Sequence, residues 1–264
     1  MPSSDSTNAH FADVTELGGQ KISAEQLERT CNRYYWATDF VKDGDVLEAA
    51  CGAGQGLGYL AQHARSVTGG DISAEVMGRA QATYGDTIDL KIFDATMIPW
   101  PDGSFDAVLL FEAIYYLPDA DAFVSEARRV LRPGGHLLIV TANKDLYDFT
   151  PSPYSTRYFG TRELAGICGK HGLEPQLWGY LDTTKVSLRQ RILRPVKLIA
   201  SRLNLIPGSM AGKVWLKKLF FGSMTEMPGS ILDTPHPYNP PEPISTENPD
   251  RRHKVIYCAA QRKE

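Results

Sequence analysis

Short apolar stretches alternate along the chain with segments in which apolar positions recur every three or four residues. The apolar stretches predict strands at residues 45–50, 66–71, 88–93, 105–111, 136–141, 173–181 and 254–260. The periodic segments predict helices at residues 23–40, 55–64, 73–83, 119–131 and 161–171. Helices placed between nearly continuous apolar strands are typical of a parallel sheet covered on both faces. The pattern therefore predicts a doubly wound α/β fold.

Two segments do not follow this alternation. Residues 1–22 are polar and aperiodic, which indicates a flexible N-terminal tail. Residues 182–252 are far longer than a usual connection between two strands, so we expect a separate helical and Pro-rich insertion. One apolar helical face is predicted in it, with Pro195 at its start or at a kink, and it is formed by Leu188, Ile192, Val196, Ile199 and Leu203. The main domain is then residues 23–181 together with 253–264.

Composition and charge narrow the class of protein. The chain has 28 Lys and Arg against 31 Asp and Glu, and this net charge of −3 argues against a general nucleic-acid binder. No apolar run reaches the roughly 18 residues that a membrane span needs, and no basic segment precedes an apolar one as in a signal peptide. The four cysteines are scattered, which fits reduced thiols. These features predict a cytoplasmic protein.

A glycine-rich turn follows the first predicted strand of the sheet. The strand ends in an acid, Glu48, and the turn that opens the next helix contains Gly52 and Gly54. Glycine permits a positive φ and lets a ligand approach the backbone closely. The N-terminus of the helix offers free N–H groups to a carboxylate. This segment is a candidate ligand-binding turn.

Two further acids stand at matching positions. Asp71 ends the second strand, where a carboxylate accepts both hydroxyls of a ribose, and Asp94 follows the third strand, where it can accept a hydrogen bond from an adenine amino group. The carboxyl ends of parallel strands share one edge of the sheet, and open α/β sheets bind ligands there. We expect Glu48, Asp71 and Asp94 to meet in one crevice.

With these residues, the chain resembles the class I S-adenosylmethionine-dependent methyltransferases, small-molecule and glycan-modifying members in particular. The resemblance covers residues 33–181 and the last strand, and it is carried by residues 46–56, 70–73, 93–95, 104–108 and 131–135. It implies a Rossmann-like, seven-stranded sheet with an antiparallel last strand and S-adenosyl-L-methionine as cofactor. Ala50 departs from the family pattern, which often has glycine there, but alanine is also small.

The resemblance also implies roles for individual residues. Glu48, Gly52 and Gly54 would hold the methionine moiety, Asp71 the ribose, Ile72 the adenine ring, and Asp94 with Ala95 the adenine amino edge, while Phe111 and Glu112 would lie under the sulfonium. Arg33 and Tyr34 resemble an Arg-Tyr helix that folds over the cofactor and reaches its carboxylate. The alternative for that helix is an amphipathic one that packs its aromatic side chains on the sheet edge.

A nicotinamide-dinucleotide enzyme is the rival interpretation of a glycine-rich turn between strand and helix. Its fingerprint is G-x-G-x-x-G with a pyrophosphate over the helix N-terminus. Here Glu48 precedes the glycines, and its negative charge would repel a diphosphate. S-adenosylmethionine carries no phosphate and has an ammonium group, so electrostatics favours the methyl donor.

Candidates for the acceptor side follow the fourth and fifth strands. Tyr115, Asn143 and Arg157 are predicted to bind the acceptor, with Arg157 suited to an anionic group. Tyr116, Tyr154 and His236 are the candidate catalytic residues, as hydrogen-bonding groups or bases. For each, an ordinary loop residue remains the alternative. No histidine or carboxylate cluster has metal-ligand spacing, so no metal is expected.

The insertion is interpreted as a helical lid over the acceptor pocket. From Lys185 to Lys218 it contains many basic and no acidic residues, which suggests an anionic acceptor such as a nucleotide sugar or a lipid-linked glycan. A peripheral membrane contact is possible but not favoured, since the basic residues can equally be solvated. We predict O-methylation of a small polar or sugar-bearing metabolite. The alternatives are a cofactor-binding regulatory or partner subunit, and a methylator of a lipid-linked, RNA or N-nucleophile acceptor.

Overall fold

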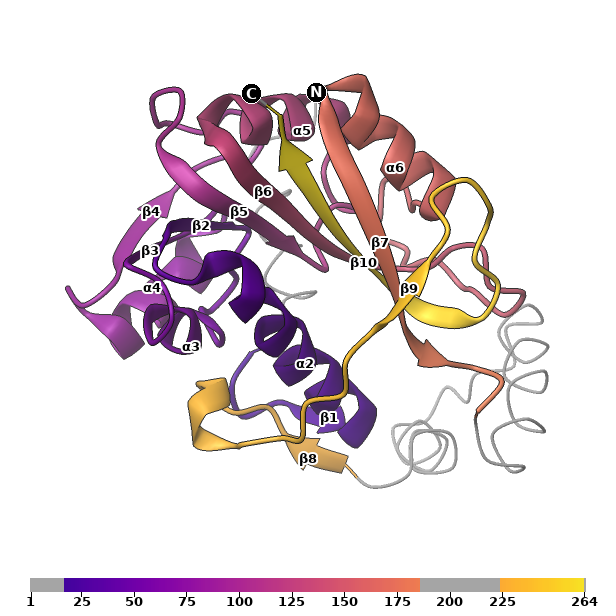
Figure 1. The fold of residues 1–264 in the computed structure, drawn as a ribbon. Helices are drawn as coiled ribbons and strands as arrows, with labels where there is room; N and C mark the ends of the chain where they lie inside the picture. Colours follow the sequence, from indigo (N-terminus) through magenta and orange to yellow (C-terminus); the bar gives the residue numbers. More distant parts are fainter. Residues whose placement is uncertain (1–16, 186–223, 264) are drawn as a thin grey trace.

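The computed structural model describes residues 17–185 and 224–263 (Figure 1). Its main sheet has eight strands in the order β4-β3-β2-β5-β6-β10-β7-β9. The bounds are β2 Asp45–Ala49, β3 Ser66–Asp71, β4 Asp89–Ile92, β5 Phe105–Phe111, β6 Leu131–Ala142, β7 Leu173–Asp182, β9 Glu242–Ile244 and β10 His253–Arg262. Strands β2 to β6 are parallel, whereas β10 lies antiparallel between β6 and β7. The predicted fold class is confirmed, including the antiparallel last strand.

Helices cover both faces of the sheet. They are α2 Ala24–Val41, α3 Leu57–Ala61, α4 Ala74–Tyr84, α5 Ala120–Val130 and α6 Thr161–Lys170, with a 3₁₀ turn η1 at Ile231–Asp233. Side chains of Ser23, Ser73 and Asp119 accept hydrogen bonds from backbone N–H groups at the starts of α2, α4 and α5. Helices α2 and α3 pack with Leu109 of β5, whereas α5 and α6 pack with its neighbour Leu110 on the opposite face.

The sheet differs from the expected seven strands at one edge. The Pro-rich stretch that precedes β10 contributes β9, which pairs antiparallel with β7 through Leu177 and Ile244. Strand β6 also begins earlier than predicted, at Leu131, and its register to β5 shifts between Phe105 and Ala107. The Pro-Gly-Gly sequence at residues 133–135 is therefore an irregularity within a strand and not only a turn before it.

The predicted flexible tail is wrong from Leu17 onward. Leu17 and Ile22 are buried, and β1 (Lys21–Ser23) pairs antiparallel with β8 (Met224–Glu226) in a separate two-stranded sheet. Two apolar side chains in a polar stretch are enough to fix this segment against the domain. Residues 1–16 lie outside the described residues, as does the predicted apolar helical face at residues 188–203. The lid therefore stays a prediction.

Among the helices of residues 17–185 and 224–263, none combines the length and the apolar character that crossing a bilayer requires.

Candidate cofactor and acceptor site

A cavity of about 600 Å³ opens at the carboxyl ends of β2, β3 and β5. Ten of the eleven predicted cofactor-binding residues line it: Arg33, Tyr34, Glu48, Gly52, Asp71, Ile72, Asp94, Ala95, Phe111 and Glu112. They come from α2, from three strand ends and from the loops that follow. The topology thus brings together the acids that the sequence places at successive strand ends. Their roles as ligand-binding groups stay predictions.

Glu48 is the most deeply buried acid of this cavity, with only 1% of its surface exposed. The Tyr34 hydroxyl donates a hydrogen bond of 2.6 Å to its Oε1 atom. Its Oε2 atom is buried and has no hydrogen-bond partner among the described residues. Burial raises the pKa of Glu48 to about 7. A carboxylate that lines a cavity with one oxygen unpaired fits a cationic ligand group, such as the ammonium of S-adenosylmethionine.

Asp71 is held by the backbone on both of its oxygens. The Gly52 N–H donates to Oδ2 at 3.1 Å and the Ser73 N–H donates to Oδ1 at 2.9 Å. Burial raises the pKa of Asp71. Each oxygen retains a second lone pair, so the carboxylate can accept two further hydrogen bonds from a diol. The neighbouring Ile72 is 39% exposed and offers an apolar surface at the cavity wall.

Asp94 is fixed by the loop that follows β4. Its Oδ1 atom accepts hydrogen bonds of 2.8 Å from the backbone N–H and from the hydroxyl of Thr96. Ala95 is buried beside it. The loop therefore presents a carboxylate in a fixed orientation next to a small apolar surface, an arrangement that suits the amino edge of a purine ring.

Two residues that are not glycine adopt left-handed backbone at this edge of the sheet. Ala50 has a φ of 54° just after β2, and Glu112 has a φ of 53° just after β5. A side chain at positive φ costs about 1–2 kcal/mol relative to the right-handed region. The backbone conformation gives a physical reason for glycine at the position of Ala50, and it shows that alanine is tolerated there at a cost. Such strain is found preferentially at functional sites.

One predicted contact of the glycine turn is corrected by the structure. Gly54 does not line the cavity, because the turn directs it toward α4, where its carbonyl accepts a hydrogen bond of 2.6 Å from the Tyr84 hydroxyl. Its φ of 81° shows that it shapes the turn instead. Tyr34 on α2 lies in the cavity wall as predicted, and its hydroxyl donates to Glu48 and orients that acid. The contact of Tyr34 with a ligand carboxylate stays a prediction.

Arg29 is a residue that the sequence interpretation missed. It forms an ion pair with Glu112, whose other carboxylate oxygen accepts a hydrogen bond of 3.0 Å from the Tyr115 hydroxyl. The Glu112 side chain is 16% exposed and that of Arg29 29%, so the pair is largely shielded from water. Arg29 precedes Arg33 by one helical turn on α2. This spacing places the two side chains on the same face of the helix and could have identified Arg29 from the sequence.

The acceptor side of the cavity is aromatic. Tyr115, Tyr116 and Tyr154 line it together with Leu117, Pro118 and Thr156. The Tyr115 ring stacks on Tyr158 at a centroid distance of 4.5 Å, and Tyr116 meets its edge at 4.6 Å. The Thr156 N–H donates to the Tyr115 carbonyl at 2.7 Å, which anchors the loop that carries Tyr154. Three predicted residues are thus brought to the cavity mouth.

The other three acceptor-side predictions are wrong in their placement. Asn143 is 1% exposed, and its amide is used within the protein: it donates to the carbonyls of Asp250 and His253 and accepts from the Asp145 N–H. The backbone N–H of His236 donates to the Tyr35 hydroxyl, and its ring lies against the Pro237 carbonyl, away from the cavity lining. The third residue, Arg157, faces a separate groove.

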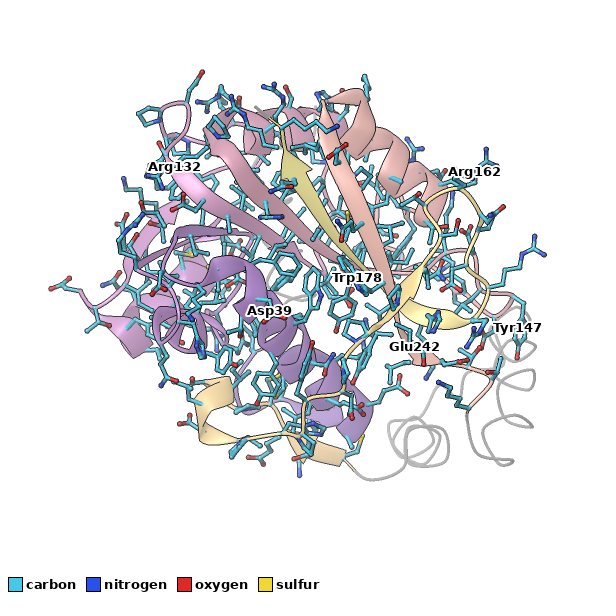
Figure 2. All side chains as sticks on the ribbon, in the orientation of Figure 1. Asp39, Arg132, Tyr147, Arg162, Trp178 and Glu242 are labelled. Carbon is cyan, nitrogen blue, oxygen red and sulfur yellow. The ribbon has the colours of Figure 1, made fainter. Side chains whose placement is uncertain are left out.

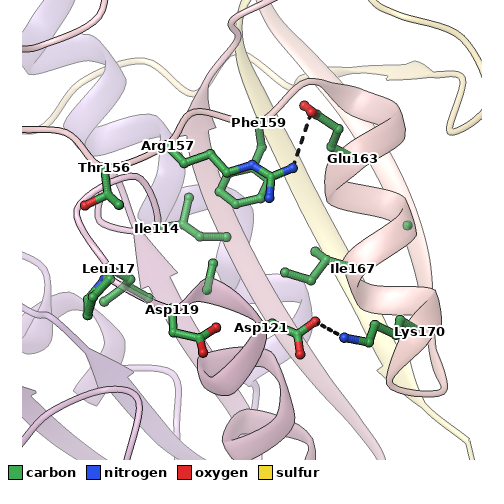
Figure 3. Close-up of a pocket in the computed structure, with 13 residues that line it drawn as sticks. Ile114, Leu117, Asp119, Asp121, Thr156, Arg157, Phe159, Glu163, Ile167 and Lys170 are labelled. Carbon is green, nitrogen blue, oxygen red and sulfur yellow. Dashed lines mark hydrogen bonds and ion pairs between the residues drawn. The ribbon is translucent and has the colours of Figure 1, made fainter.

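This groove has a volume of about 390 Å³ and lies between the loop after β5 and helix α6 (Figure 3). Arg157 lies 5.0 Å from the centroid of the Phe159 ring and pairs with Glu163, whereas Lys170 pairs with Asp121 at the other end. The floor is apolar, with Ile114 and Ile167. Leu117, Pro118 and Thr156 line both the groove and the cavity, so the two are neighbours.

Comparisons with known proteins agree with this geometry. The family described as methyltransferase domain matches residues 47–139. A probable S-adenosylmethionine-dependent methyltransferase of Mycolicibacterium smegmatis is 37% identical over 134 residues, which cover 49% of this chain and 52% of that protein. A fatty-acid O-methyltransferase of the same species is 34% identical over 141 residues, covering 51% and 52%. The chain thus spans about half the length of these curated relatives.

Solved structures show the same fold at low sequence identity. A methyltransferase of Thermotoga maritima, described as a possible histamine N-methyltransferase, has a TM-score of 0.57 and 15% sequence identity. The alignment covers 90% of this chain and 92% of that protein. The [4+2]-cyclase SpnF also has a TM-score of 0.57, with 17% identity over 98% of this chain and 92% of its own. Because these two proteins of similar fold are described as catalysing different reactions, the fold alone does not determine the chemistry.

The sheet order, the crevice and these similarities together define a Rossmann-like methyltransferase fold. Within it, residues 47–139 match the family described as methyltransferase domain, and 49% of the chain is similar to a protein named as a probable S-adenosylmethionine-dependent methyltransferase. The family implies S-adenosyl-L-methionine as the cofactor, and the unpaired Oε2 atom of Glu48 fits that group.

Proposed function

We propose that this chain is an S-adenosylmethionine-dependent methyltransferase that methylates an oxygen atom of a small acceptor. One observation carries the proposal: Glu48, Asp71 and Asp94, from the ends of three successive strands, line one cavity in which the most deeply buried of them has an unpaired oxygen. The names of the relatives support it, since several are described as S-adenosylmethionine-dependent methyltransferases.

The donor half of the cavity has a role for each acid. When bound, S-adenosylmethionine supplies a methyl group on a positively charged sulfur, which needs no further activation. Glu48 would bind the ammonium group. Asp71 would accept hydrogen bonds from the two ribose hydroxyls, and Asp94 would accept one from the adenine amino group. Because these carboxylates are fixed by Tyr34, Gly52, Ser73 and Thr96, they need little reorganisation on binding.

The acceptor half favours an acceptor with an apolar or aromatic body over a sugar-bearing one. Arg33 is the one Lys or Arg among the described residues that line the cavity, and Arg157 lies outside it, so the case for an anionic acceptor is weak. Tyrosines, Leu117 and Pro118 offer flat apolar surfaces with hydroxyl groups at their tips. Relatives named as a fatty-acid O-methyltransferase and a demethylmenaquinone methyltransferase support this choice.

Tyr116 and Tyr154 are the proposed acceptor-orienting residues. Bound in the cavity, S-adenosylmethionine would supply the methyl group: its carbon–sulfur bond would break as the acceptor oxygen bonds the methyl carbon, and S-adenosylhomocysteine would leave. A hydroxyl acceptor would lose its proton to water at the cavity mouth, and these residues would hold the acceptor oxygen against the methyl group. A tyrosine hydroxyl at the cavity mouth can hydrogen-bond the acceptor oxygen and keep it in line. Aromatic side chains around it exclude water from the path of the methyl group.

The test is turnover with a panel of acceptors, measured as release of S-adenosylhomocysteine by the full chain. The panel pairs hydroxylated or carboxylated apolar compounds with nucleotide sugars and simple glycosides. We expect micromolar donor binding and turnover with members of the apolar set. The absence of donor binding would refute the methyltransferase proposal, whereas turnover with the sugar-bearing set alone would refute the proposed acceptor class. Donor binding without any turnover would favour a regulatory or partner subunit.

A further inference from the structure

A second cluster of polar side chains lies at the other end of the sheet order, where β7, β9 and β10 meet. Asp182 ends β7, Glu242 begins β9 and His253 begins β10, and ligand atoms of all three lie within 4.8 Å of one another. Figure 2 shows Glu242 on β9 at this edge of the molecule. The three residues also line one cavity of about 350 Å³. We propose that they bind a divalent first-row transition metal, with Zn²⁺ as the best fit.

Strand register creates this cluster. His253 is the direct partner of Asp182 in the β10–β7 ladder, and Glu242 is the partner of Gly179 in the β9–β7 ladder. The three residues therefore approach from three adjacent strands, although they lie far apart in the sequence. Pairing of backbone strands fixes the positions of their Cα atoms, so the cluster does not depend on the conformation of a loop.

His253 is oriented as a metal ligand. Its side chain is 3% exposed, and its Nδ1 atom lies 2.9 Å from Oδ2 of Asp250. An ionised carboxylate can only accept, so Nδ1 carries a proton, and in the neutral form of the ring the lone pair is on Nε2. This Nε2 atom is buried, has no hydrogen-bond partner among the described residues, and lies 3.7 Å from Glu242 Oε2. A carboxylate on the far ring nitrogen is the usual partner of a metal-binding histidine.

The sheet makes room for this imidazole. A Cβ atom at Gly179 would lie 2.2 Å from Nδ1 of His253, so any residue other than glycine would displace the ring. Gly179 thus allows β7 to carry a buried histidine across its face.

Two exposed cations now pair with the carboxylates of the cluster. Arg252 pairs with Asp182 and Lys185 with Glu242, and their side chains are 53% and 64% exposed. The Lys185–Glu242 pair is exposed on both sides and contributes little free energy, because water solvates the separated charges well. The Asp182 side chain is only 5% exposed, so its pair with Arg252 competes more strongly with a metal. Both cationic side chains reach solvent and can return to it when a metal binds, whereas the buried His253 stays in place. The cluster therefore has a fixed ligand and two carboxylates that a metal ion can recruit.

The ligand set selects the class of metal. Imidazole nitrogen with carboxylate oxygens suits Zn²⁺ and its first-row neighbours, whereas Ca²⁺ and Mg²⁺ prefer sets made of oxygen alone. Asp182 and His253 stand at the two ends of residues 183–252, and Glu242 lies within that segment. A bound ion would therefore link the two ends of this long segment, and the free energy of metal binding would offset the entropy cost of closing it.

The test is titration of the full chain, after treatment with a chelator, with Zn²⁺ alone by calorimetry and with Co²⁺ by visible absorption. We expect one saturable Zn²⁺ site and Co²⁺ bands in the visible range. Glu242→Gln, a change at a side chain that is 46% exposed, should weaken Zn²⁺ binding at least tenfold without unfolding the chain. His253→Gln should remove the site. Glu247→Gln, an exposed acid outside the cluster, is the matched control and should leave binding unchanged.

Arg252→Ala separates a metal site from a simple ion-pair network. Since this change frees Asp182 from its competing cation, it should tighten Zn²⁺ binding severalfold. The proposal is overturned by the absence of saturable Zn²⁺ binding in both the unmodified chain and Arg252→Ala. It is equally overturned if Glu242→Gln and His253→Gln bind Zn²⁺ as the unmodified chain does. Neither result depends on methyltransferase activity, so the two proposals can fail separately.

Discussion

The proposed donor half and the proposed acceptor half of the cavity are built in different ways. In the donor half, Glu48, Asp71 and Asp94 each belong to or follow a strand of the sheet, and Asp71 and Asp94 accept hydrogen bonds from N–H groups nearby in the fold. In the acceptor half, Tyr115 and Tyr116 come from the loop after β5, while Tyr154 belongs to a loop some forty positions later that hydrogen-bonds to Tyr115.

This difference indicates which parts of the chain determine the position of each group of binding residues. The donor half is fixed by regular strand ends, so its side chains keep their places as long as the sheet forms. The acceptor half depends on contacts between loops, which tolerate more change in sequence. The substitutions below test this division, because each should affect one half and leave the other unchanged.

Asp71→Ala should have the largest effect. It removes the acceptor of both ribose hydroxyls, and hydrogen bonds to a charged group contribute about 1.5–3 kcal/mol each. We expect donor affinity to fall by at least roughly 100-fold in calorimetry. Asp89→Ala, at an exposed acid at the start of β4, is the control and should bind normally. Unchanged donor affinity in Asp71→Ala would contradict the assignment of the ribose hydroxyls to Asp71.

Glu48→Gln should weaken donor binding and stabilise the free protein. The pKa of Glu48 is raised to about 7, so the folded protein holds this proton more tightly than the unfolded chain does. Its stabilising contribution is complete below the unfolded pKa and is lost as pH rises through 7, a loss of about 3 kcal/mol. Denaturation at several pH values should show this loss in the unmodified chain and its absence in Glu48→Gln.

The same group makes donor binding depend on pH. An ammonium needs the ionised carboxylate, so affinity should fall as pH drops below 7 and protonates Glu48. Between pH 7.5 and 5.5 we expect calorimetry to show a loss of roughly 25-fold, the ratio of the ionised fractions of Glu48 at the two pH values. This dependence should be absent in Glu48→Gln. A flat pH profile in the unmodified chain would contradict the assignment of the ammonium to Glu48.

Tyr116→Phe and Tyr154→Phe should act on the acceptor alone. Loss of one neutral hydrogen bond costs about 0.5–1.5 kcal/mol, so the acceptor KM should rise by roughly 3- to 10-fold. Donor affinity should be unchanged, because Glu48 and Asp71 are held by Tyr34, Gly52 and Ser73 and not through these two hydroxyls. Tyr147→Phe, at an exposed tyrosine outside the cavity, is the control. Steady-state kinetics with both substrates separates the two outcomes.

Ala50→Gly should have the smallest effect, on stability. Relief of the side chain at a φ of 54° gains about 1–2 kcal/mol, and the greater flexibility of glycine in the unfolded chain offsets about half of it. We expect Tm to rise by roughly 1–4 °C in thermal denaturation. A lower Tm would show that the methyl group of Ala50 contributes more by packing than it costs in strain.

The placement of Glu48, Asp71 and Asp94 in one cavity could be predicted from the sequence because the information is local. An acid at the end of an apolar strand must lie at the carboxyl edge of the sheet, whatever the rest of the chain does. Gly54 was misjudged since the pattern cannot tell a glycine that faces the ligand from one that shapes the turn. Ala50 fits the pattern as a small residue, but its left-handed conformation becomes evident only in the structure.

The acceptor half and the far edge of the sheet were harder to predict because they depend on tertiary contacts. Asn143 lies at the end of its strand as expected, but its side-chain amide donates a hydrogen bond to the carbonyl of Asp250. Strand β9 comes from a Pro-rich stretch that has no strand pattern, and pairing with β7 alone makes it a strand. The cluster of Asp182, Glu242 and His253 has no ligand spacing in the sequence, since strand register brings its members together.

The position of β10 between β6 and β7 has a consequence for synthesis of the chain on the ribosome. Residues 183–252 must be translated before β10 exists, and until then the facing edges of β6 and β7 lack the strand that pairs with both. These two strand edges are therefore exposed to other nascent chains for as long as those residues take to emerge, and unpaired strand edges are where aggregation begins. Insertion of β10 closes both edges at once.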